Sequence, residues 1–474
     1  MAGYNYISTV TASDGAGQDK FGASVALSRD GLVMAVGASD ESNTFSWQGA
    51  VYIYDWDGTS WVERSKIYAS DPAQSDYFGK SCALSADGSI LAVGAYAAEG
   101  SQSAQGQLYI FDWNGSAWVE RGILSPFEVA AYFFGRGCAL SGDGNTLVVG
   151  ASGASSSRGY VYTYDWDGAA WVQRGTYLSA YDAGTSDEFG YACALSEDGT
   201  YLAVGAPFWD GAIALDQGAV YVYTRNGTSW DSVKRITASE TAGDGTLSNK
   251  FGWSCSLSSD GMTMAVGCPE WSAPSPDYSI YGKVYFFQHD GSTWVETGWV
   301  QKEPLVSYTY FGTGCALSGS GSVLAVGHER ESSLLGAVFM YQKILSISFT
   351  LIESLAATTF YAVLNSMTGT HVASAEVTGQ SGAIEVSSAD PVLLTVFPKI
   401  GSSWVSSTSY ALNDKVFPTD PTTSPFYYEC TTAGTSGSTE PTWPSTGSVV
   451  DGTVEWVYVE RIVQPITHGP LIPA

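Results

Sequence analysis

The sequence predicts an all-β protein whose first 343 residues form a ring of six four-stranded units, a six-bladed β-propeller. The main observation is a Phe-Gly pair that recurs at intervals of 57, 56, 55, 62 and 60 residues. A period of this length with strand-like content is typical of a radial or solenoid array. The six pairs begin at Phe21, Phe78, Phe134, Phe189, Phe251 and Phe311.

The second observation is that one repeat contains four strand signals. Asp30-Gly31 and Asp57-Gly58 are tight-turn pairs, each with apolar or aromatic runs on both sides. The run Met34–Ala38 has no polar alternation, as expected for a strand buried on both faces. Four antiparallel strands in one repeat describe a propeller blade. The strands expected in the first blade are 24–28, 34–38, 49–54 and 61–67.

The third observation concerns the two ends of the array. The sixth unit has strands at 311–317, 324–327 and 336–341, and then the pattern stops without its Trp-containing strand. Residues 4–13 resemble the fourth strand and linker of other units. We therefore expect them to pair with 336–341 and close the ring, which also removes an exposed sheet edge.

The repeat resembles the FG-GAP repeat of integrin α-subunit propellers and their bacterial relatives. The resemblance is fullest at Phe189-Gly190 and Val204-Gly205-Ala206-Pro207. Calcium-binding members of that family carry an Asp-rich loop between the first two strands of a blade. In this chain the same loop is a short turn, such as Arg29-Asp30-Gly31, which cannot wrap an ion. We therefore expect no metal site and no cofactor.

The composition limits the classes of binding partner that we expect for this chain. The formal net charge of −27 disfavours nucleic acid and anionic membrane surfaces. No apolar run is long enough for a transmembrane helix, and the start lacks a secretory signal. Cysteines occupy one slot of the first strand where the first blade has Val25, so we expect buried thiols rather than disulfides. These five residues are Cys82, Cys138, Cys193, Cys255 and Cys315.

Residues 344–400 are predicted to form a small β-sandwich that serves as a spacer or an oligomerisation module. Residues 401–474 resemble the small carbohydrate-binding-like modules of tail fibres and other virion proteins of tailed bacteriophages. In such modules exposed aromatic rings stack on sugars, so the resemblance implies a glycan-binding set. The alternative is that these rings pack the core of a small domain, a role that suits Trp404 and Trp456. The candidates are Trp443, Tyr428, Tyr427 and Trp404.

A second candidate surface lies on the propeller. Strand connectivity places the linkers between blades and the gaps between second and third strands on one face. The gaps 39–48, 96–105, 207–217 and 269–281 are the longest. Function concentrates on such loops, and the family resemblance implies ligand binding on this face. Its aromatic candidates are Trp47, Tyr96, Phe208, Trp209, Trp271, Tyr278 and Tyr281.

No catalytic constellation stands out, since none of the four histidines lies in a metal or triad motif. We therefore expect a non-enzymatic bacteriophage virion protein, of the tail fibre or surface adhesin type, that binds a host cell-surface glycan or receptor. It would be made in the host cytoplasm, form a homo-oligomer and contact other virion proteins, without membrane insertion. Two alternatives stay open: a scaffold or decoration protein that binds only viral proteins, and a glycan-degrading tailspike-like enzyme.

Overall fold

The computed structural model describes residues 4–99, 104–126, 132–211, 215–239, 249–272, 279–304, 310–329 and 335–343. From residue 345 onward it describes the strands given below, together with residues 436 and 438. The chain forms two compact units, Met1–Lys343 and Ile344–Ala474. Among the described residues, no helix has the length and apolar character needed to span a bilayer.

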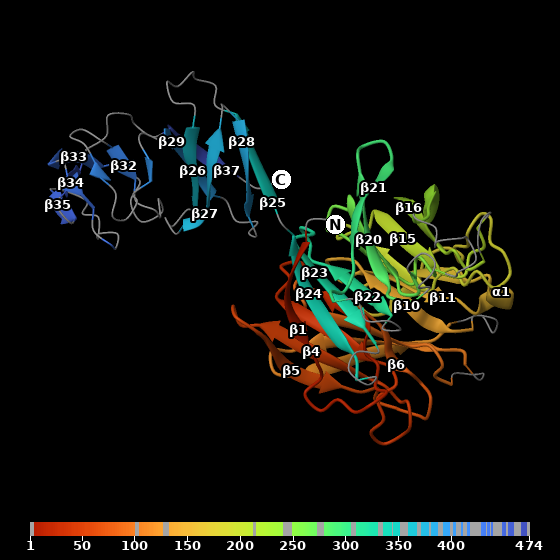
Figure 1. Ribbon diagram of the computed structural model, residues 1–474. Helices are drawn as coiled ribbons and strands as arrows, with labels where there is room; N and C mark the ends of the chain where they lie inside the picture. The colour runs from red at the N-terminus through yellow and green to blue at the C-terminus, as the bar shows by residue number, and fades with distance from the viewer. Residues whose placement is uncertain are drawn as a thin grey trace. The chain divides into compact units, whose positions relative to one another are not determined.

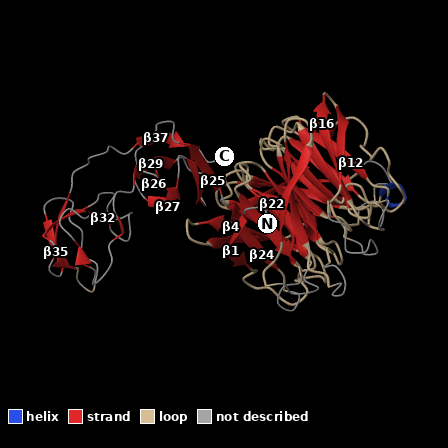
Figure 2. Ribbon diagram, turned by 45° about the horizontal axis from the view of Figure 1, so that its top comes forward, coloured by secondary structure: helices blue, strands red, loops and turns tan. Residues whose placement is uncertain are grey.

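The first unit consists of six four-stranded antiparallel sheets, as the sequence predicts (Figures 1 and 2). Blade 1 contains β2 (Phe21–Leu27), β3 (Val33–Ala38), β4 (Ala50–Trp56) and β5 (Trp61–Ile67). Blade 2 contains β6 (Phe78–Leu84), β7 (Ile90–Ala95), β8 (Gln107–Trp113) and β9 (Trp118–Leu124). Blade 3 contains β10 (Phe134–Leu140), β11 (Thr146–Ala151), the short helix α1 (Ala154–Ser157), β12 (Tyr160–Trp166) and β13 (Trp171–Gln173).

The other three blades repeat this order. Blade 4 contains β14 (Ala192–Leu195), β15 (Tyr201–Ala206), β16 (Ala219–Asn226) and β17 (Ser229–Ile236). Blade 5 contains β18 (Ser254–Leu257), β19 (Thr263–Cys268), β20 (Lys283–His289) and β21 (Trp294–Val300). Blade 6 contains β22 (Phe311–Leu317), β23 (Val323–His328), β24 (Ala337–Lys343) and, from the N-terminus, β1 (Tyr4–Val10).

The N-terminal strand closes the ring, which confirms the predicted closure. β1 runs antiparallel to β24, from Tyr4 opposite Lys343 to Val10 opposite Val338. The first strands of the blades then contact one another in a complete circle, β2 to β6, β10, β14, β18, β22 and back to β2. These six inner strands surround the centre of the ring. Each Phe of a Phe-Gly pair is fully buried, which explains why the pair marks every blade.

Adjacent blades approach one another at glycine. A Cβ added to Gly37 of β3 would lie 1.9 Å from the carbonyl oxygen of Gly79 in the next blade. Equivalent contacts of 1.9–2.1 Å occur between all six blades, including Gly327 against Gly22 across the closure. In three blades a serine hydroxyl also donates to this carbonyl, as Ser24 Oγ does to Gly79 O at 2.8 Å. The glycines of both repeat motifs are therefore required by backbone packing.

The repeated tryptophans of the fourth strands are structural. Each packs against the hydrophobic cluster between two blades. Two of the outer strands also carry an arginine that pairs with an aspartate of its own blade and covers a tryptophan of the next. Arg64 pairs with Asp55 and lies 4.7 Å from the ring centre of Trp113. The five repeated tryptophans of the fourth strands are Trp61, Trp118, Trp171, Trp230 and Trp294.

The second unit is also built of β-strands. β25 (Leu345–Thr350) pairs with β28 (Ser381–Val386). A four-stranded sheet has the order β27 (His371–Thr378), β26 (Thr359–Ser366), β29 (Val392–Pro398) and β37 (Ile466–Leu471). A five-stranded sheet has the order β30 (Ser402–Ser403), β32 (Lys415–Phe417), β33 (Tyr428–Thr432), β36 (Val454–Tyr458) and β35 (Ser448–Asp451). β31 (Ser409–Tyr410) pairs with β34 (Gly434–Thr435).

One strand of this unit crosses the domain boundary expected near residue 400. β37, at the end of the chain, pairs with β29 of the region assigned to the sandwich. The region 344–400 therefore takes a strand from the last ten residues, a long-range pairing that local sequence pattern does not encode. The division of residues 344–474 into a sandwich and a separate module stays a prediction.

The glycine contacts lead to a stability prediction. Gly94→Ala places a Cβ 1.9 Å from Gly135 O, a backbone atom that only a shift of the whole blade can move. We expect a loss of at least about 3 kcal/mol in the free energy of unfolding, the upper end of the usual cost of overpacking. Gly122→Ala is the matched control, since a Cβ there meets nothing within 4 Å. Denaturant unfolding of both variants checks this, and equal stability would contradict the packing argument.

Candidate functional site

The long loops of the propeller meet around one mouth of the central channel. The gap between the second and third strands of a blade hydrogen-bonds the linker that enters the next blade. Thus Tyr77 N donates to Trp47 O at 3.1 Å and Phe78 N donates to Gln48 O at 3.0 Å. The same contact joins Phe133 to Ala104, and it recurs at the two following linkers. Each linker is therefore held by the preceding blade.

The residue before each Phe-Gly pair is held in the left-handed region although none of the six is glycine. Their φ values lie between 53° and 60°. This conformation costs free energy for a residue with a side chain, and such residues are concentrated at functional sites. The conformation recurs at the same position before all six blades. The residues are Lys20, Tyr77, Phe133, Glu188, Lys250 and Tyr310.

The residue that follows each Phe-Gly pair lines the channel. These six positions carry different side chains although they are equivalent in the ring, so they give the channel an asymmetric wall. They are Ala23, Lys80, Arg136, Tyr191, Trp253 and Thr313. The channel itself is narrow, with a cavity volume of about 70 Å³. It opens into a wider hollow of about 320 Å³, which we call the mouth site. The mouth site is lined by Lys20, Ser39, Asp40, Tyr77, Lys80, Tyr96, Arg136, Trp253, Pro269, Glu270, Tyr310 and Glu329.

Aromatic rings form two groups along the mouth site. In the first, Trp47 stacks on Tyr77 with ring centres 6.4 Å apart, and Tyr77 stacks on Tyr96 at 5.3 Å. In the second, Tyr191, Phe208 and Trp253 contact one another at 4.5–6.2 Å.

Arg136 connects the two aromatic groups. Its guanidinium carbon lies 4.4 Å from the ring centre of Tyr96 and 4.2 Å from that of Tyr191. It also donates a hydrogen bond of 2.6 Å to Tyr191 Oη. The guanidinium is held in place by cation–π contacts with both rings and by this hydrogen bond.

The charged groups of the mouth site fall into two classes. Lys20 pairs with Asp40 at 3.0 Å, and Glu270 pairs with Lys250 at 2.7 Å. Lys80 and Arg136, in contrast, have no carboxylate within 4 Å among the described residues. Glu329 is 7% exposed, and its Oε2 atom has no hydrogen-bond partner among those residues.

Burial shifts the pKa values of several charged groups in and around the mouth site. Burial, followed by the charge of Arg136, lowers the pKa of Lys80 to about 8. For Lys20, burial also acts to lower the pKa, but the carboxylates of Glu329 and Asp40 outweigh it and the net shift is upward. Burial raises the pKa of Glu188, with Arg136 acting against it. A set of perturbed groups around one hollow is typical of a functional site.

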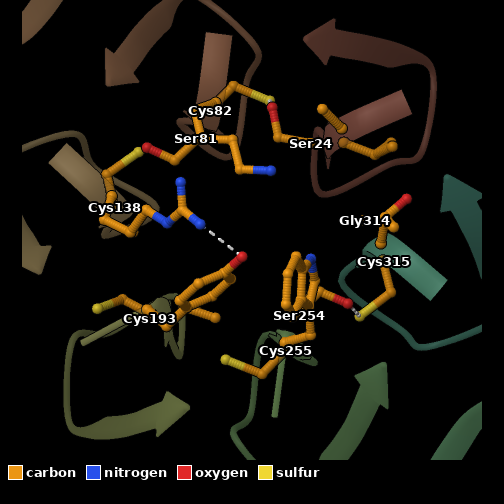
Figure 3. A pocket seen from close by; sticks show the side chains of 18 residues that line it. Ser24, Ser81, Cys82, Cys138, Cys193, Ser254, Cys255, Gly314 and Cys315 are labelled. Atoms are coloured by element: carbon orange, nitrogen blue, oxygen red, sulfur yellow. Dashed lines mark hydrogen bonds between the residues drawn. The ribbon is translucent and has the colours of Figure 1, made fainter. Parts of the chain in front are cut away.

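Below the mouth site the channel wall is made of serines and cysteines from successive inner strands (Figure 3). Ser24 Oγ donates to Cys82 Sγ at 3.3 Å, and Ser254 Oγ donates to Cys315 Sγ at the same distance. Cys82 Sγ in turn contacts Ala35 O of the preceding blade at 3.6 Å. Burial raises the pKa of the Cys82 thiol to about 12. All six cysteines of the first unit are buried and free, so this slot serves packing.

The aromatic residues proposed from the sequence divide between two places. Trp47, Tyr96 and Phe208 belong to the aromatic groups of the mouth. Trp209 instead covers Arg235 of the outer strand β17 at 4.2 Å. Trp271 covers the buried Lys283 of β20 at 3.6 Å, and its carbonyl accepts a hydrogen bond from Tyr281 N.

The remaining proposed residues are not brought to this mouth by any described contact. Tyr428 begins β33, where its backbone pairs with Tyr458 of β36. Four lie outside the described residues: Tyr278, Trp404, Tyr427 and Trp443.

Sequence reasoning missed the charged centre of the mouth site. Lys80, Arg136 and Trp253 immediately follow a Phe-Gly pair, and Tyr77 and Lys20 immediately precede one. The pair itself is buried and structural, and only its neighbours differ between the blades. A repeat whose fixed residues are buried leaves function to positions that differ between copies, and that signal was present in the sequence.

The hairpins of the opposite face hold their own carboxylates. Asp30 Oδ1 accepts hydrogen bonds from Ser28 Oγ at 2.6 Å and from Leu32 N at 3.0 Å. The same pattern recurs at Asp87, Asp143, Asp198 and Asp260. Within the described ranges, no group of three or more acidic, histidine or cysteine side chains is arranged to hold a metal ion.

Comparison with protein-family models agrees with the repeats of the first unit. A family model described as FG-GAP repeat matches residues 4–54, 61–111 and 171–223. These segments are thus FG-GAP repeats, and the unit that contains them is a β-propeller. A comparison with curated proteins gives no match. Among solved structures, a periplasmic gluconolactonase of Pseudomonas aeruginosa is similar at 14% identity and a TM-score of 0.42, over 76% of this chain and 87% of that one.

The turn geometry predicts that metal removal has no effect. The hairpin carboxylates are already occupied by their own turns, so a chelator has no structural cation to extract from them. The melting temperature in EDTA should equal that in calcium-containing buffer. A fall of several degrees in EDTA would show that metal sites of the integrin type are present.

Proposed function

We propose that this chain is a non-enzymatic virion surface protein of the tail fibre or adhesin type, which binds a host cell-surface glycan at the mouth site of its propeller. The observation that carries the proposal is the pair of aromatic groups, joined by Arg136, around a hollow of about 320 Å³. This volume lies at the low end of the range for small-molecule sites.

The chemistry of the hollow suits a sugar. A pyranose ring has an apolar C–H face and an edge of hydroxyl groups. Aromatic side chains offer flat apolar surfaces, and charged groups offer strong hydrogen bonds to hydroxyls. Trp47 is 43% exposed and stacked on Tyr77, so its ring forms an accessible platform at the rim.

The scaffold favours binding without large rearrangement. The linkers and gaps around the mouth are hydrogen-bonded to one another and rest on blades in backbone contact. A preformed site loses little conformational entropy when a ligand binds. Contact between one sugar and one platform is weak, so we infer that useful avidity comes from many copies on one particle or in a homo-oligomer.

The virion location is supported by the resemblance of residues 401–474 to modules of phage tail proteins. In this proposal the second unit supplies attachment to other virion proteins, a further glycan contact at Trp443, or both. The propeller supplies recognition of the host. A protein that serves only as a scaffold would share the fold and lack the glycan affinity.

The proposal is tested with the purified full-length chain on an array of bacterial surface glycans. We expect wild-type protein to bind a defined subset. Trp47→Ala should weaken that binding about two- to tenfold, since one aromatic contact contributes roughly 0.5–1.5 kcal/mol. Tyr181→Ala is the matched control, because Tyr181 is 65% exposed in a linker but belongs to neither aromatic group of the mouth. The control should bind like wild type.

Each other outcome has a definite meaning. Loss of binding in Trp443→Ala with normal binding in Trp47→Ala would move recognition to the second unit and contradict the role of the mouth. No glycan binding by wild-type protein, together with co-sedimentation with phage particles, would favour the scaffold. Absence of the chain from purified particles would contradict the virion location.

A further inference from the structure

The unpaired charges of the mouth site identify a class of ligand. Three basic and three acidic residues line the hollow. Lys20 and Asp40 neutralise each other, and Glu270 is neutralised by Lys250. Lys80, Arg136 and Glu329 are left without ion-pair partners among the described residues, and their formal charges sum to +1.

Lys80 and Arg136 line one hollow without a carboxylate within 4 Å among the described residues, although the chain is strongly acidic. It has only 20 basic residues against 47 acidic ones, and nine other basic residues of the described part each contact a carboxylate. Lys80 and Arg136 occupy equivalent positions of neighbouring blades and line both the channel and the hollow. The repulsion between these two positive charges is unfavourable, and an anion bound next to both would offset it.

Glu329 is a carboxylate in the same hollow that needs hydrogen-bond donors. It follows β23, is 7% exposed, and leaves Oε2 unpartnered among the described residues. A buried carboxylate without donors costs free energy, and hydroxyl groups of a ligand in the hollow that Glu329 lines would lower that cost. Glu329 forms no ion pair with Lys80 or Arg136 although all three line the same hollow. The space between them is therefore available to a ligand.

We propose that the mouth site binds an acidic sugar, whose carboxylate is held by Arg136 and Lys80 and whose hydroxyl groups donate to Glu329. This inference rests on the proposed glycan-binding function and names the ligand class for it. A guanidinium matches a carboxylate with two parallel hydrogen bonds, and the Nε atom of Arg136 has no hydrogen-bond partner among the described residues. The aromatic walls, among them Tyr77, Tyr96 and Trp253, contact the C–H face of the sugar ring.

An acidic sugar is the ligand class that suits the two cations, Glu329 and the aromatic walls together. A neutral sugar has hydroxyl groups for Glu329 but no anion for the two cations. Inorganic phosphate satisfies the cations but has no apolar face for the aromatic walls. A sugar carboxylate, as in a uronic acid, supplies the anion, the hydroxyl donors and the apolar face in one ring.

The test compares two oligosaccharides that differ at one group, one ending in glucuronate and the other its carboxyl-reduced, glucose-terminated counterpart. Titration calorimetry with the full chain should show at least tenfold tighter binding of the glucuronate form. Lys80→Met and Arg136→Ala should each weaken that binding tenfold or more and remove the preference. Arg29→Ala removes an equal charge from an exposed residue on the opposite face and should bind like wild type.

The pH dependence gives a readout that a purely structural role would not alter. Lys80 faces Arg136, Glu329, Lys20 and Asp40, and in the free protein its pKa is about 8. Binding of the glucuronate form should fall between pH 7 and pH 9 as this ammonium loses its proton. Lys80→Arg, which stays charged, should remove that fall.

Failure of the acidic-sugar inference can be distinguished from failure of the proposed glycan binding. Equal affinity for the two oligosaccharides, or an array on which only neutral glycans bind, would overturn the acidic-sugar inference and leave glycan binding intact. Competition by inorganic phosphate alone, with no binding to any glycan, would overturn both. Unchanged binding in Lys80→Met would exclude the lysine as a ligand contact even if Arg136→Ala fails to fold.

Discussion

The structure of the propeller depends on the close approach of backbones between neighbouring blades. The carbonyl of the glycine in each Phe-Gly pair lies where a Cβ of the preceding blade would have to be, at Gly37, Gly94 and their equivalents. Glycine at both positions lets six inner strands pack into one circle around a channel of only about 70 Å³. The buried phenylalanines and the tryptophans of the fourth strands fill the space between neighbouring blades, which widens from this contact toward the outside of the ring.

The same constraint positions the functional face. With the glycine and phenylalanine fixed, the residue after each pair must line the channel, and the residue before it is held at positive φ over the mouth. Lys80, Arg136 and Trp253 come from strand positions that the ring makes equivalent. Their side chains differ, so a symmetric scaffold carries an asymmetric site. Strain in the backbone of the preceding residues is maintained by the hydrogen bonds between linkers and gaps.

Much of the fold could be predicted from sequence because it depends on local repeats. The interval between Phe-Gly pairs, the Asp-Gly turns and the missing last strand led to six blades and to closure by β1. The pairing of β37 with β29 could not be found in this way, since it joins segments about 70 residues apart that share no repeat. For the site, exposure of aromatic loops identified Trp47, Tyr96 and Phe208 but also Trp209 and Trp271. Sequence does not show that the last two cover Arg235 and Lys283 of their own blades.

In this proposal, the mouth of the propeller channel is a glycan-binding site. The most direct measurement is a crystal structure of the full chain soaked with an oligosaccharide that ends in glucuronate. The account predicts a sugar ring in the hollow between Tyr77, Tyr96 and Trp253, with its carboxylate within hydrogen-bond distance of Arg136. A sugar bound only in the second unit, with the mouth site empty at saturating ligand, would contradict it.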